Sequence, residues 1–232
     1  MSKEAELLSD YYNCRDCQNL AAEHWQSPVY PVSWGYFRSD VPFFFLGEAP
    51  GYTKELGPRT TPFPDDSING NLRDTFVNAV LNETGSSSPI VQAIRRWMTS
   101  LESALGEDKR TVLGKISYTN AIKFQVKNTK KLSKELWKKW ANLKICDKPQ
   151  KERFVNHCIV HLKEEIEYTK PAVVICLGKT AFDAVSLVSR ETSMKFEVLP
   201  TPHPSRSRYS SEQTDALSHI IARLLSQTSR AR

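Results

Sequence analysis

The sequence PAVVICLGKT, residues 171–180, contains the clearest strand signal of the chain. Pro171 ends the helical pattern before it, AVVICLG is a short continuous apolar run, and a new helical pattern begins at Thr180. Such a run between two helices is typical of a strand that is buried on both faces of a parallel sheet.

Working outward from this segment, the chain alternates between short apolar runs and helical patterns. Further strands are predicted for FFFLG (43–47), KISYT (115–119) and FEVLP (196–200), and helices for residues 2–12, 71–82, 89–105, 152–168 and 212–226. This alternation predicts parallel βαβ units. We therefore expect an α/β fold, a three-layer αβα sandwich around a mostly parallel four-stranded sheet.

The composition is that of an ordinary globular protein. The chain has 232 residues, of which 40% are hydrophobic and 25% charged, so we expect a single domain over residues 1–227, followed by a disordered basic tail at 228–232. No apolar run approaches the roughly 18 residues needed to cross a bilayer, and the first residues lack the apolar stretch of a secretory signal. We expect a monomeric, cytoplasmic, nucleoid-associated protein.

The positive charge is concentrated in one segment. The whole chain carries a net charge of +6, whereas residues 123–151 contain ten lysines and only two acidic residues, a net charge of +8. A clustered basic segment indicates a polyanionic partner, although a solvated lysine-rich helix face is the alternative interpretation. We interpret residues 123–151 as an insertion within the domain.

Ligand sites in parallel sheets lie beyond the carboxyl ends of the strands, and four features of the sequence fall there. GEAPG follows the first strand, Asn120 the second, Gly178 the third and His203 the fourth. Prolines on both sides of His203 fix its backbone, which suits a catalytic donor. Gly178 begins a GKT triplet, but Val173 replaces the glycine that a phosphate loop requires, so we assign this turn to tight packing beside the pocket.

Together these motifs resemble the uracil-DNA glycosylase superfamily. The resemblance rests on GEAPG, the TN-x-x-K segment (Thr119, Asn120, Lys123), VVICLG and TPHPS, and it covers about residues 10–210. The match of C-x2-C-x2-L (Cys14, Cys17, Leu20) makes the iron-sulfur, family 4 type the most similar.

The resemblance implies a role for each matching residue in cutting an N-glycosidic bond. His203 would hydrogen-bond the departing base, Asn120 would read its edge, and Phe63 would stack on it. Glu48 would position the attacking water, with Glu55 as the second choice. The remaining substrate-binding residues would be Gly47, Ala49 and Ser205.

The target base must leave the duplex to reach such a pocket. The segment after His203 suits the DNA contact, with Arg206 and Arg208 holding phosphates. Lys123 and Lys127, from the lysine-rich segment, would add salt-sensitive affinity for DNA.

The cysteines depart from the pattern of the family. Four thiolates hold its 4Fe-4S cluster, and Cys14, Cys17 and Cys158 match three of them, but Phe124 stands at the remaining position. We expect Cys146 to replace it; a 4Fe-4S cluster, a zinc ion and free thiols remain the alternatives. Cys176 is expected in the core, and His157 and His161 are expected to face solvent or the helix packing.

The resemblance thus implies a DNA glycosylase that removes uracil in base excision repair. The alternatives are a glycosylase for hypoxanthine or xanthine, and a superfamily member that binds DNA without turnover.

Overall fold

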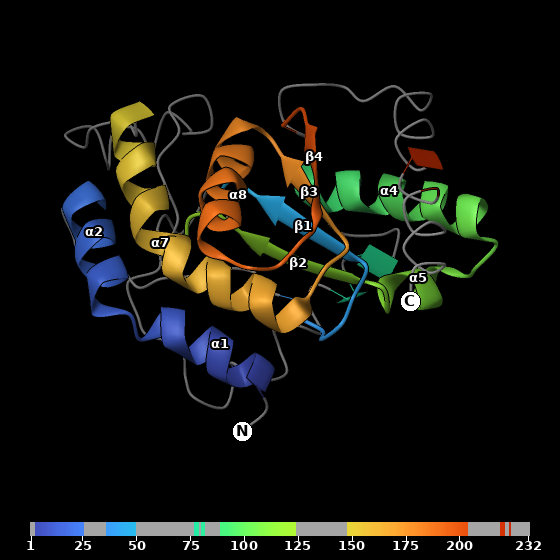
Figure 1. Ribbon diagram of the computed structural model, residues 1–232, viewed down its shortest axis with the longest axis horizontal. Coiled ribbons are helices and arrows are strands. Elements are labelled where there is room, and N and C mark those ends of the chain that lie inside the picture. The colour runs from blue at the N-terminus through green and yellow to red at the C-terminus, as the bar shows by residue number, and fades with distance from the viewer. Residues whose placement is uncertain are drawn as a thin grey trace, which may run out of the picture.

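The computed structural model describes residues 3–25, 36–49, 77–78, 80–81, 89–123, 148–203, 219–220 and 223. Within these residues, helices alternate with four short strands (Figure 1). In chain order the elements are α1 (Lys3–Tyr12), α2 (Arg15–Trp25), β1 (Phe43–Gly47), α4 (Pro89–Leu105), α5 (Lys109–Leu113), β2 (Ile116–Asn120), α7 (Lys148–Thr169), β3 (Val173–Leu177), α8 (Lys179–Glu191) and β4 (Glu197–Thr201).

The four strands form one parallel sheet in the order β2-β1-β3-β4. Gly47 at the end of β1 is in register with Asn120 at the end of β2, and Leu177 at the end of β3 is in register with Thr201 at the end of β4. All four carboxyl ends therefore lie along one edge. The predicted α/β fold with a parallel four-stranded sheet is confirmed.

Each face of the sheet carries its own hydrophobic core, which explains the continuous apolar runs. Phe44 and Leu46 point into a core shared with α2, α7 and α8, whereas Phe43 and Phe45 point into a core shared with α4 and α5. Figure 1 shows these two groups of helices on opposite sides of the sheet. The result is the expected three-layer sandwich.

Two helices were not expected from the sequence. Helix α2 buries Cys17, Leu20, Ala21, His24 and Trp25, which recur at helical spacing. Two of these positions are Cys and His, so the apolar stripe is difficult to see in the sequence. Helix α5 is one short turn, and the Asp108 side chain caps it by accepting a hydrogen bond from the Thr111 amide at 2.9 Å.

Candidate functional site

The ends of the four strands bring the expected polar residues together. Glu48 follows β1 directly, Asn120 is the last residue of β2, and His203 lies two residues beyond β4. The Ala121 amide donates to the Gly47 carbonyl at 2.9 Å, and the Ile122 amide donates to the Glu48 carbonyl at 2.9 Å. The segments that carry Glu48 and Asn120 are therefore joined beyond the sheet.

The Glu48 carboxylate is held by two helices. Thr180 at the start of α8 donates its hydroxyl to Oε2 at 3.0 Å, and Lys151 in the first turns of α7 forms an ion pair with Oε1. Burial alone would raise the pKa of Glu48, but Lys151, Thr180 and the charge of His203 outweigh it and hold the pKa below its ordinary value. Glu48 is thus an ionised, oriented carboxylate at neutral pH.

His203 packs directly against Gly178, the residue between β3 and α8. Gly178 has a φ of +108°, and a Cβ added there would lie 3.0 Å from Cβ and 3.1 Å from Cδ2 of His203. The Gly178 amide donates to the Thr201 carbonyl at 2.9 Å, which joins the two turns. Glycine is required here by both the backbone conformation and the imidazole, in agreement with the predicted packing role.

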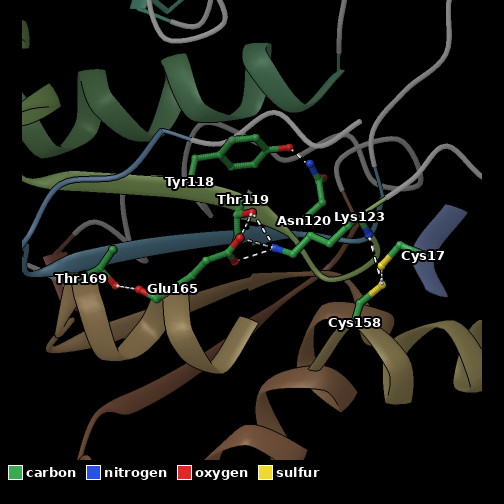
Figure 2. A network of polar contacts seen from close by, with 8 residues as sticks. All are labelled: Cys17, Tyr118, Thr119, Asn120, Lys123, Cys158, Glu165 and Thr169. Atoms are coloured by element: carbon green, nitrogen blue, oxygen red, sulfur yellow. Dashed lines mark hydrogen bonds and ion pairs between the residues drawn. The ribbon is translucent and has the colours of Figure 1, made fainter. Parts of the chain in front are cut away.

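Asn120 is completely buried, and a neighbouring phenol fixes its side chain (Figure 2). The Tyr118 hydroxyl donates to Asn120 Oδ1 at 3.0 Å. Burial raises the pKa of Tyr118, against the opposing effect of this hydrogen bond, so the phenol stays protonated and remains a donor. Among the substrate-binding candidates, Gly47 is the last residue of β1, and Ala49 packs against the core on the α7 side of the sheet.

Lys123 was expected to contact DNA, and the structure contradicts this. Its side chain is 0% exposed, and Nζ lies 2.6 Å from both carboxylate oxygens of Glu165 and 3.0 Å from Thr119 Oγ1. Burial raises the pKa of Glu165 to about 7, while Lys123 and Thr119 oppose the rise. The TN-x-x-K segment therefore ends in a buried ion pair that attaches β2 to α7 (Figure 2).

A cluster of sulfur and imidazole groups lies where α2 meets α7. Cys17 Sγ is 4.0 Å from Cys158 Sγ, and the ligand atoms of Cys14, Cys17 and His161 all lie within 4.8 Å of one another. The Cys17 amide donates to Cys14 Sγ at 3.4 Å, and the Lys123 amide donates to Cys158 Sγ at 3.5 Å. The thiols of Cys14 and Cys17 and the imidazole of His161 could hold a metal ion.

The structure corrects the expectation for His161. It is 8% exposed and belongs to the cluster rather than to solvent or ordinary helix packing. Burial, then Lys123 and His157, lower the pKa of His161 to about 4, so its imidazole is neutral at neutral pH and able to bind a metal. His157 is half-buried, with Nε2 3.9 Å from Cys14 Sγ. Cys176 is buried in β3, as predicted.

Two features of this site were missed by the sequence reasoning. Cys158 and His161 form a C-x2-H pair on one face of α7, a spacing that would have indicated His161 as a ligand beside the C-x2-C pair. The partnership of Lys151 with Glu48 has no comparable signal in the sequence. The remaining predicted site residues lie outside the residues that the structure describes; they are Glu55, Phe63, Lys127, Cys146, Ser205, Arg206 and Arg208.

Comparison with known proteins identifies a protein family that matches this chain. A family model described as the Uracil DNA glycosylase superfamily matches residues 34–225. No curated protein matches the chain. Among the residues that the structure describes, no helix is both long and apolar enough to span a membrane.

Proposed function

The chain belongs to the uracil-DNA glycosylase superfamily, and from this membership we propose that it hydrolyses the N-glycosidic bond of uracil in DNA. The observation that carries the proposal is the assembly of Glu48, Asn120 and His203 at one edge of the sheet. The three side chains differ in chemistry, and each suits one requirement of the reaction.

The first requirement is stabilisation of the departing base. Uracil leaves as an anion with negative charge spread onto its carbonyl oxygens, and a preorganised donor aimed at that charge lowers the barrier. His203 is the donor in this proposal, facing the O2 side of the base. Its contact with Gly178 limits how far the imidazole can move, so the donor is oriented before substrate binds.

The second requirement is recognition of uracil. A carboxamide can donate through Nδ2 to O4 of uracil and accept from N3–H through Oδ1, whereas cytosine presents a donor and an acceptor in the opposite places. Asn120 is completely buried, and Tyr118 orients its Oδ1. In this proposal cytosine is rejected because it would leave buried polar groups unpaired.

The third requirement is an oriented water beside a sugar that becomes positively charged. An ionised carboxylate both orients a water and stabilises the developing cation. Glu48 is held ionised by Lys151 and Thr180, and we assign it this role, with Glu55 as the second choice. Phe63 is proposed to stack on the base, and Gly47, Ala49 and Ser205 to line the pocket.

DNA contact is assigned to basic residues of the sequence other than Lys123. We retain Arg206, Arg208 and Lys127 as proposed phosphate contacts of a monomeric protein, and remove Lys123 because its ammonium is fully buried. We therefore expect the affinity for DNA to depend on salt concentration, but less steeply than the net charge of residues 123–151 alone suggests.

The test is base release from oligonucleotides that carry one uracil, hypoxanthine or xanthine, followed by alkaline cleavage of abasic sites. We expect uracil release, lowered about 10²–10³-fold in His203→Ala by loss of one donor to the departing anion. Asn120→Ala should lower it about 10–100-fold, by loss of a buried hydrogen bond. His219→Ala, which changes an exposed histidine, is the matched control and should leave the rate unchanged.

The other outcomes identify the alternatives. Release of hypoxanthine or xanthine without uracil would assign the pocket to a different base. Binding to DNA with no release of any base would assign the chain to DNA recognition without turnover and would overturn the proposal.

A further inference from the structure

The cysteine cluster contains four groups that can bind a metal, from two parts of the chain that are far apart in sequence. Cys14 directly precedes α2 and Cys17 lies in its first turn, whereas Cys158 and His161 lie one turn apart on α7. Cys17 and Cys158 are both completely buried. Three thiols and an imidazole that converge in this way, with no disulfide among them, have the composition of a Cys3His metal site.

The spacing of Cys14, Cys17 and His161 matches a single ion, and Cys158 joins this group through its contact with Cys17. With Zn–S bonds of about 2.3 Å, the thiolates of a tetrahedral zinc site lie about 3.8 Å apart. Cys17 Sγ and Cys158 Sγ are separated by 4.0 Å, and the Cys14, Cys17 and His161 ligand atoms lie within 4.8 Å of one another. In a 4Fe-4S cluster each thiolate binds a different iron, so the cube of iron and sulfide would have to fit between groups that here stand close to contact.

The surroundings of the sulfur atoms also suit bound thiolates. The Cys17 amide points at Cys14 Sγ, and the Lys123 amide points at Cys158 Sγ. Backbone donors of this kind stabilise the negative charge of metal-bound sulfur and orient the ligand. One cysteine on each side of the site, Cys14 before α2 and Cys158 on α7, thus accepts a hydrogen bond from a backbone amide.

The fourth ligand decides the net charge of the site. Zn²⁺ with three thiolates and a neutral imidazole carries a charge of −1, whereas four thiolates would give −2. Lys123, a buried cation beside the site, is already paired with Glu165, and the cost of a buried charge grows steeply with its size. A histidine as fourth ligand therefore suits this location better than a fourth thiolate.

We propose that Cys14, Cys17, Cys158 and His161 bind one zinc ion, so that His161 takes the place of the missing cluster ligand and Cys146 is not required. The ion joins α2 to α7. Through the Lys123 amide it also supports the turn that follows β2, whose last residue is Asn120. The proposal concerns the metal alone and does not depend on which base, if any, the protein releases.

The first test is made on the full-length, unmodified protein, without any substitution. We expect about one zinc and no stoichiometric iron per chain by elemental analysis. Zinc X-ray absorption should give three sulfur ligands at about 2.3 Å and one nitrogen at about 2.0–2.1 Å. A brown protein with about four irons per chain, a zinc site of four sulfurs, or a protein with no bound metal would each overturn the proposal.

Variants then assign the nitrogen. His161→Ala should lower zinc affinity at least 10-fold in a chelator competition, whereas the matched control His219→Ala, which changes an exposed histidine, should retain native affinity. His161→Cys should keep one zinc with four sulfur ligands, which separates loss of a ligand from loss of folding. Cys146→Ser should retain zinc. Native affinity in His161→Ala, or loss of zinc in Cys146→Ser, would contradict the assignment.

Discussion

Replacement of Lys123 by methionine tests the buried ion pair that ends the TN-x-x-K segment. Lys123 Nζ lies 2.6 Å from both oxygens of Glu165, and the two side chains are 0% and 1% exposed. At an effective dielectric constant of about 20, charges at this distance attract by about 6 kcal/mol. Because removing two ions from water costs several kcal/mol each, the intact pair contributes little net stability.

Removal of Lys123 alone has a larger effect. Within the part of the chain that the structure describes, the buried Glu165 carboxylate then keeps only the Thr119 hydroxyl, at 3.4 Å, as a hydrogen-bond donor. We expect Lys123→Met to lower the free energy of unfolding by about 3–5 kcal/mol. The double variant Lys123→Met, Glu165→Leu should recover most of this loss, because it leaves no unpaired charge.

The loss should also depend on pH. Burial raises the pKa of Glu165 to about 7 in the native protein, and removal of the lysine raises it further. A raised carboxyl pKa contributes stability at low pH that is lost as pH rises. Above about pH 7 the native carboxyl ionises while the variant's does not, so the deficit of Lys123→Met should grow by up to about 1.4 kcal/mol per pH unit.

The assay is urea unfolding of each variant at pH 6, 7 and 8. Lys115→Met is the matched control: its ion pair with Glu107 has the same 2.6 Å distance, but the two side chains are 34% and 28% exposed. It should cost less than about 1 kcal/mol. The reasoning would be refuted if Lys123→Met unfolded at the native urea midpoint while the salt dependence of DNA binding fell by about one phosphate contact.

Two further predictions concern the edge of the sheet. Lys151→Gln removes the cation that holds the pKa of Glu48 below its ordinary value, so the acid limb of the kcat/KM profile should move to higher pH. The control Lys148→Gln, whose side chain is 78% exposed, should leave the profile in place. An acid limb that does not move in Lys151→Gln would exclude Glu48 as the titrating group. Gly178→Ala places a Cβ 3.0 Å from the adjacent imidazole at a φ of +108° and should cost about 1–3 kcal/mol of stability and at least 10-fold in turnover. Gly106→Ala, at a φ of +66° with no atom within 4 Å, should show the backbone strain alone, and equal turnover in the two variants would contradict the steric argument.

Much of the fold could be predicted because a strand buried on both faces leaves a continuous apolar run. The runs at 43–47 and 171–177 both contain observed strands, since their residues alternate between two cores and neither face can be polar. The residues directly after such runs must lie at one sheet edge, so the order of strands and polar residues along the chain is enough to place Glu48, Asn120 and His203 together. Helix α2 was not predicted, because a stripe built partly from Cys17 and His24 does not resemble a hydrophobic face.

The cysteine site was predicted only in part, for a similar reason. The C-x2-C pair and Cys158 were identified from the sequence. His161 was not, because a histidine on a helix has no partner until the fold brings another element to it. The structure places its ring beside Cys14 and Cys17, more than 140 residues earlier in the chain.

The lysines of residues 123–151 mark the boundary between what the sequence alone determines and what requires the fold. The sequence determines their number and the net charge of +8. The tertiary structure decides that Lys123 is buried against Glu165, that Lys151 binds Glu48, and that Lys148 is exposed. The physical reason is that charge is a property of each residue, whereas the effect of that charge depends on its exposure to solvent and on its partners. Segments distant in the sequence determine both.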